Sequence, residues 1–75
     1  MKTYLSIIIS SEGGKASEIT KKICNMGFET EMGSHDFVYD WKKAEVTHSE
    51  VTKLVDNVQE NLKGMNVKFN ITTLK

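Results

Sequence analysis

The residues best suited to chemistry lie in segment 10–17, which reads Ser-Ser-Glu-Gly-Gly-Lys-Ala-Ser. It follows an apolar, β-branched stretch and precedes a helical pattern, which predicts a loop that opens a helix. The free N–H groups and the dipole at a helix start attract a negative group, and small residues let a ligand approach the backbone. We therefore expect a small anionic metabolite to bind, if anywhere, at Ser10, Ser11, Gly13, Gly14 and Lys15. The alternative is a plain turn, because glycine pairs are common in loops.

The other residue types that do chemistry form no recognisable constellation. The loop lacks the spacing of the nucleotide-binding P-loop and of the dinucleotide fingerprint. His35 and His48 each have an acidic residue nearby and are expected at the solvated surface. Cys24, the single cysteine, lies beside the apolar stripe of a predicted helix, so we expect a buried or half-buried thiol. We expect no catalytic residue, no metal and no cofactor.

Three aromatic residues, Phe37, Tyr39 and Trp41, alternate along one predicted strand. Segment 37–39 is similar to the strand on which RNA-recognition domains stack bases, although acidic residues flank it here. Burying a large aromatic ring stabilises a fold far more than leaving it wet. We therefore favour rings that face the helices and fill the core. Outward rings would instead indicate a protein partner or, less favourably, RNA.

Composition narrows the class of partner. Ten lysines balance ten acidic residues, and there is no arginine, so binding to nucleic acid is not expected. The apolar run at the start is too short and too interrupted for a signal peptide or a membrane span, so no membrane partner is expected either. One cysteine suits a reducing compartment, and we expect a cytoplasmic protein. Seventy-five residues form one domain, residues 1–75, with a small core.

Hydrophobic periodicity predicts the order strand, helix, strand, strand, helix, strand. The expected ranges are 2–10, 15–26, 28–32, 36–42, 47–62 and 66–74. Gly27 and Gly64 follow the last apolar residues of the two helices and are predicted to occupy left-handed C′ positions. Thr47 and Glu50 have the spacing of a capping box. The turn between the second and third strands is expected at Gly33-Ser34-His35.

Right-handed crossovers convert this order into a ferredoxin-like two-layer sandwich with strand order 4-1-3-2 and both helices on one face. The first helix is expected to pack through Ala16, Ile19, Ile23 and Met26. The second packs through Val51, Leu54, Val55, Val58 and Leu62. The other sheet face remains open and carries Tyr4, Ser6, Ile8, Glu29, Glu31, Val38, Asp40, Lys68 and Asn70. A possible interface for self-association on this face comprises Tyr4, Ile8, Val38, Lys68 and Asn70.

Parts of the chain resemble known binding modules. The strand, glycine-containing loop and helix of the first half resemble ligand-sensing ACT domains, whose effectors bind near that loop. Segments 27–34 and 71–75 are similar to a family of small thiamine-binding proteins. These resemblances imply a binding role and assign no site residue. We expect a noncatalytic module that recognises a small metabolite or a protein partner and self-associates. The alternative is a small enzyme, or an enzyme subunit, that uses the open sheet face as a pocket wall.

Overall fold

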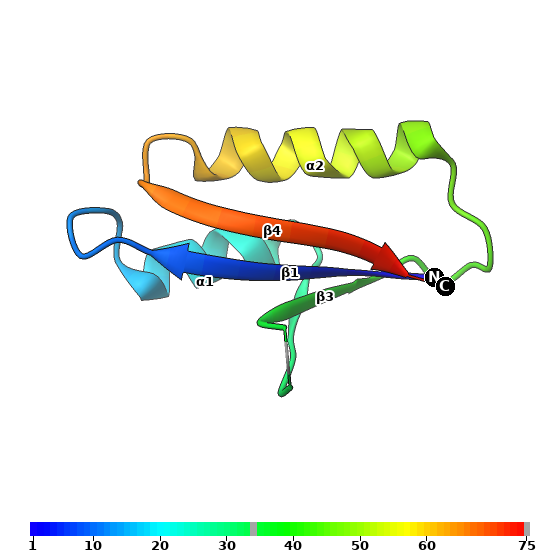
Figure 1. Cartoon of the computed structure of the whole chain (residues 1–75), viewed down its shortest axis with the longest axis horizontal. Helices are drawn as coiled ribbons and strands as arrows, with labels where there is room; N and C mark the ends of the chain where they lie inside the picture. The colour runs from blue at the N-terminus through cyan, green and yellow to red at the C-terminus, as the bar shows by residue number, and fades with distance from the viewer. Residues whose placement is uncertain (34, 75) are drawn as a thin grey trace.

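The computed structural model describes residues 1–33 and 35–74. Within this part of the chain, six elements follow in the predicted order: β1 (Lys2–Ile9), α1 (Ala16–Asn25), β2 (Glu29–Thr30), β3 (Phe37–Asp40), α2 (His48–Leu62) and β4 (Val67–Leu74). The strands form an antiparallel sheet in the order β2-β3-β1-β4. This is the predicted ferredoxin-like sandwich. Figure 1 shows β1 and β4 side by side, with α2 running along β4.

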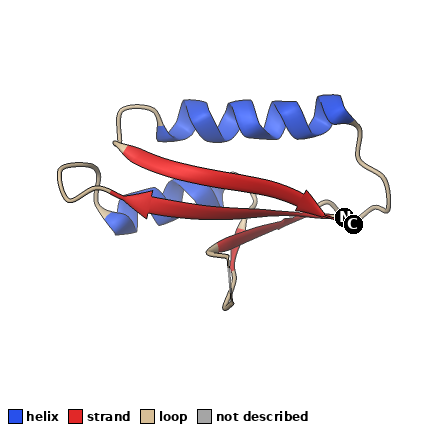
Figure 2. Cartoon of the chain, in the orientation of Figure 1, coloured by secondary structure: helices blue, strands red, loops and turns tan. Residues whose placement is uncertain are grey.

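The longest ladder of the sheet joins β1 to β4. Its eight pairs run without interruption from Lys2 opposite Leu74 to Ile9 opposite Val67. The two long strands in Figure 2 are these two. The pairing with β3 is shorter and runs from Lys2 opposite Asp40 to Leu5 opposite Phe37. The two central strands are therefore β1 and β3, the strands with the largest share of apolar residues.

The core lies between the sheet and the two helices. Eight apolar side chains are buried there: Leu5, Ile19, Ile23, Phe28, Phe37, Leu54, Val58 and Leu62. Phe37 is buried, and Tyr39 and Trp41 pack against the same cluster. The Trp41 indole N–H donates to Thr3 Oγ1 at 2.7 Å, which satisfies its polar atom. The inward orientation of these three aromatic rings is confirmed, so they are packed on the core side of the sheet rather than presented on its open face.

Both helix stops use glycine as predicted. Gly27 and Gly64 have φ of 101° and 85°, values that favour glycine. At Gly27 a second reason applies, because a Cβ there would lie 2.9 Å from Tyr39 Cε2. After α2, Lys63 is already extended and the Met65 N–H donates to the Leu62 carbonyl, so a tight turn leads into β4.

The predicted capping box at the start of α2 is confirmed. The Glu50 N–H donates to Thr47 Oγ1, and the Thr47 N–H donates to Glu50 Oε1. Lys43 also pairs with the Glu50 carboxylate. The hydrogen bond from Lys43, followed by that from the Thr47 backbone, holds the pKa of Glu50 below its ordinary value of 4.5.

The hairpin of β2 and β3 is shorter than predicted. The Asp36 N–H donates to the Leu5 carbonyl and its carboxylate accepts from the Ile7 N–H, so Asp36 ends the regular ladder by binding β1 through its side chain. At the other end, Lys42 has φ of 58°, and its N–H donates to Asp40 Oδ1 in a local turn. Met32 is fully exposed. Ser34 of the predicted turn lies outside the described residues.

Two single-residue expectations are wrong. Cys24 and Ala16 are exposed, because α1 buries only the narrow stripe through Ile19 and Ile23. His35 is only partly exposed, since its ring lies on Tyr4 with ring centroids 4.9 Å apart. The neighbouring Ser6 hydroxyl lies 3.3 Å from His35 Nδ1. Tyr4 presents its ring on the open sheet face, and the nearby His35 ring packs on it.

We predict that Leu54→Ala lowers the free energy of unfolding by roughly 2–4 kcal/mol and Val58→Ala by somewhat less, because each leaves a cavity in the core. Urea denaturation measures both, with Lys53→Ala on the exposed side of α2 as the control. Losses below about 0.5 kcal/mol at both core sites would contradict the position of α2.

The capping box predicts a dependence of stability on pH. Since the pKa of Glu50 is lowered in the folded chain, its contribution is present above about 4.5 and disappears as pH falls through the folded value. Glu50→Gln removes the carboxylate charge and leaves a side-chain oxygen that can still accept a hydrogen bond. The difference in unfolding free energy between the wild type and this variant should be largest near pH 7 and should shrink below about pH 4. A difference that stays constant from pH 7 to pH 3 would contradict this account.

Candidate functional site

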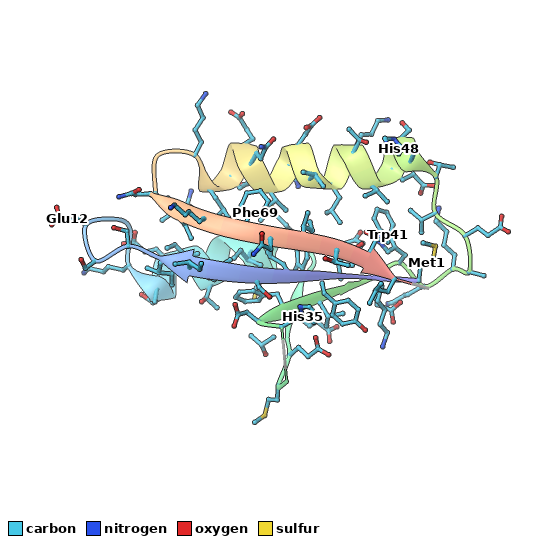
Figure 3. The ribbon with its side chains drawn as sticks, in the orientation of Figure 1. Met1, Glu12, His35, Trp41, His48 and Phe69 are labelled. Carbon is cyan, nitrogen blue, oxygen red and sulfur yellow. The ribbon has the colours of Figure 1, made fainter. Side chains whose placement is uncertain are left out.

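The loop predicted to bind an anion packs on a neighbouring loop. Its Gly14 N–H donates to the Met65 carbonyl at 2.9 Å, and its Gly13 N–H donates to the Ser10 carbonyl at 3.1 Å. The Glu12 N–H donates to Ser10 Oγ. Figure 3 places Glu12 at the tip of this loop. Ser11 and Lys15 are exposed, and Lys15 occupies the N-cap of α1 with no side-chain cap. The loop therefore brings its residues together, but three of its N–H groups already have partners within the chain.

The two loop glycines are needed for close approach rather than for a left-handed turn. Neither Gly13 nor Gly14 has a positive φ. A Cβ on Gly13 would lie 2.3 Å from the Met65 carbonyl oxygen, and one on Gly14 would lie 2.6 Å from Met65 Cε. The glycines thus let the loop before α1 pack on the loop before β4. Binding of an anion at this loop stays a prediction.

The predicted interface residues share the open face of the sheet. Tyr4 lies opposite Val38, and Ile8 lies opposite Lys68, while Asn70 is paired with Ser6. Ile8 has 66% of its surface exposed, whereas Tyr4 and Val38 are half-buried. His35 covers part of Tyr4 on this face. Figure 3 shows His35 beside β3. The face is therefore mixed, with one prominent apolar residue.

The free edge of β4 is more distinctive than this face. On β1, the backbone groups of Met1, Leu5 and Ile7 bond toward β3 or Asp36. Backbone groups alternate in direction along a strand, so the even-numbered residues of β1 bond to β4. Their partners on β4 are also even-numbered. The N–H and C=O groups that face away from the sheet therefore belong to these residues: Val67, Phe69, Ile71 and Thr73.

A groove runs between this edge and α2. Two adjoining hollows of about 500 and 580 Å³ are lined in common by Gln59, Val67 and Phe69. Val55 contributes to the larger one. Phe69 lies between β4 and α2 in Figure 3 and is half-buried. The edge is thus a row of backbone donors and acceptors beside a partly apolar groove.

The opposite edge of the sheet is protected. β2 has two residues, Glu29 and Thr30, and both are exposed. Glu31 follows directly, but its side chain is half-buried, so Glu29 is the exposed carboxylate of this edge. Short, charged edges resist pairing with another chain, whereas β4 has eight residues and one charge, Lys68.

Two features of the surface were not predicted from the sequence. One is the stack of His35 on Tyr4, which depends on a turn whose path the sequence does not specify. The other is a hollow beside the second half of β1, lined by Ile7, Ile9, Thr20, Thr30, Asp36 and Phe37. The sequence places Ile7 and Ile9 on the helix side of β1, but the hollow forms because pairing with β3 ends at Leu5, which the sequence does not indicate.

Comparisons with protein-family models, curated proteins and solved structures found no match to this chain. Within the described residues, no group of three or more His, Cys, Asp or Glu side chains is placed to hold a metal ion. No helix in that part of the chain is long and apolar enough to cross a membrane.

The close approach of the two loops predicts that Gly13→Ala destabilises the fold by about 1–3 kcal/mol, because its Cβ meets a backbone oxygen that cannot move alone. Gly14→Ala should cost less, since the end of the Met65 side chain can rotate away. Urea denaturation compares both with Ser11→Ala, a change at an exposed position of the same loop. Equal stability of Gly13→Ala and Ser11→Ala would contradict the packing of the two loops.

Proposed function

We propose that this chain is a noncatalytic protein-binding module that works through the free edge of β4, and that a second copy of the chain is its partner there. The observation that carries the proposal is the contrast between the two sheet edges. β2 is short and acidic, whereas β4 offers eight residues in an unbroken ladder with a single lysine. Natural proteins protect long, uncharged edges unless pairing is useful.

The side of α2 beside this edge also suits a second copy. Val55 and Gln59 line the groove, and the residues one and two turns earlier on the same side are Thr52 and His48. No Asp, Glu or Lys occurs at these four positions. Along this stretch of α2 two copies oppose no carboxylates or ammonium groups. The charged residues Glu60 and Lys63 line the groove at its other end, beside the start of β4.

Self-pairing of β4 avoids placing its lysines opposite each other. A two-fold axis perpendicular to the sheet keeps the helices of both copies on one face, so even-numbered residues must oppose even-numbered residues. When the pairing is centred on Asn70, Lys68 lies opposite Thr72. When it is centred on Ile71, Lys68 lies opposite Leu74. Lys68 meets its own copy only in a register shifted to the start of the strand, which has few pairs.

The proposal also includes a cytoplasmic location and a role in binding rather than in catalysis. An exposed, single cysteine suits a reducing compartment such as the cytoplasm. The enzyme alternative needs titratable groups that converge in a hollow on the open face. The hollow beside Ile8 is lined by Ser10, Asn66 and Lys68 as well, and so contains one titratable group. A second hollow, lined by Glu29, Tyr39, Asp40 and Lys42 among others, is where the enzyme alternative would place its site. We advance binding because the contrast between the two sheet edges supports it directly.

Sedimentation equilibrium tests the proposal between about 10 µM and 1 mM, the range expected for a small interface. We expect a reversible dimer. Asn70→Lys should weaken it at least about ten-fold, or ~1.4 kcal/mol, because the two introduced ammonium groups then stand directly opposite each other when pairing is centred on Asn70, or diagonally across the pair when it is centred on Ile71. The side chain of Asn70 is exposed, so the monomer should keep its fold.

The matched control is Asn25→Lys, the same chemical change at the exposed end of α1. It alters the net charge equally and should leave the dimer unchanged. A monomer at every concentration, or a dimer that both variants weaken equally, would refute pairing through β4.

A further inference from the structure

The second half of β1 extends past β3 and keeps a free edge of its own. Pairing with β3 ends at Leu5, and the next N–H on that side, from Ile7, donates to Asp36 Oδ2 at 2.8 Å. Because backbone groups alternate in direction along a strand, the Ile7 C=O and the Ile9 N–H point to the same side of β1 as the Ile7 N–H. No strand among residues 1–33 and 35–74 pairs with them. Figure 1 shows the arrowhead end of β1 extending beyond β3.

A hollow of about 380 Å³ opens beside this edge. Its apolar walls are Ile7, Ile9 and Phe37, and Ile9 has 39% of its surface exposed. Two hydroxyls, from Thr20 and Thr30, and the carboxylate of Asp36 complete the lining. A mostly apolar hollow of this size with a few polar groups is typical of a site for a small ligand.

The sheet restricts what can lie along this edge. A ligand that pairs with the backbone of Ile7 and Ile9 lies next to β1 on the same side as β3. That position is already filled by β3 as far as Asp36. The ligand chain must therefore end there. A terminal carboxylate beside Asp36 would be repelled, whereas a terminal ammonium would be attracted. The end that fits is an amino terminus.

We propose that this hollow binds the amino-terminal end of a short, extended peptide with an apolar side chain. The peptide adds two or three residues beside β1, parallel to it, as in other cases of strand addition. The Ile7 C=O accepts from a peptide N–H, and the Ile9 N–H donates to a peptide C=O. The ammonium contacts Asp36, and one apolar side chain enters the hollow between Ile9 and Phe37.

This site is independent of the proposed dimer. It lies on the side of β1 that faces β3, and β4 occupies the other side. A chain that stays monomeric can bind the peptide, and a chain that dimerises can fail to bind it. The oligomeric state and the peptide titration therefore test different claims.

Titration of the ¹⁵N-labelled full chain with the dipeptide amide Leu-Val-NH₂, followed by NMR, tests the proposal. We expect saturable shifts at the amides of Ile7, Ile9 and Phe37. N-acetylation of the same dipeptide removes the charge and should weaken binding at least about ten-fold, because it abolishes a charge-assisted contact. This comparison uses the unchanged protein, so it remains decisive if a variant fails to fold.

Asp36→Asn keeps an oxygen that can accept from the Ile7 N–H and removes the charge. It should weaken binding of the free dipeptide at least about ten-fold and leave binding of the acetylated one unchanged. Asp56→Asn, the same change on the exposed side of α2, should affect neither. No saturable shifts up to about 10 mM, equal binding of the two dipeptides, or shifts confined to other elements would overturn the proposal.

Discussion

The direction of the backbone groups along β1 is the constraint on which the rest of the sheet depends. Bonds to Met1 and Leu5 and the bond from Ile7 commit the odd-numbered residues to the side of β3, which leaves the even-numbered residues for β4. The same alternation turns four residues of β4 outward and points Ile7 and Ile9 into the gap beyond β3. One strand thereby determines both the edge proposed for the dimer and the edge proposed for the peptide.

The two helices make this arrangement stable on one face only. Leu54, Val58 and Leu62 of α2 pack with Ile19 and Ile23 of α1 over the sheet, and the capping box defines where α2 begins. A domain of this size buries a limited share of its surface, so contacts outside the core matter for its stability. Pairing of β4 with a second copy would cover the groove beside Phe69 and extend the sheet without disturbing the core.

Much of the fold could be predicted from the sequence because periodicity, glycine stops and the cap agree. The strand order, the burial of Leu54, Val58 and Leu62 on α2, the positive φ of Gly27 and Gly64 and the Thr47–Glu50 box are confirmed. Val51 and Val55, which were also expected to pack, are half-buried and lie outside the core cluster. The length of the hairpin could not be predicted, since it depends on Asp36 reaching across to Ile7. Nor could the role of Gly13 and Gly14, which depends on contact with Met65, a residue far away in the sequence.

Hydrogen–deuterium exchange of the β4 amides, measured residue by residue by NMR, tests the central claim most directly. Lys68, Asn70 and Thr72 bond to β1, so their amides should be protected at every protein concentration. The amides of Phe69, Ile71 and Thr73 face outward, and they should exchange fast in dilute solution and gain protection as concentration rises. Outward amides whose exchange does not depend on concentration, or protection that is equal at all positions of β4, would contradict an edge that is free in the monomer and paired between two copies.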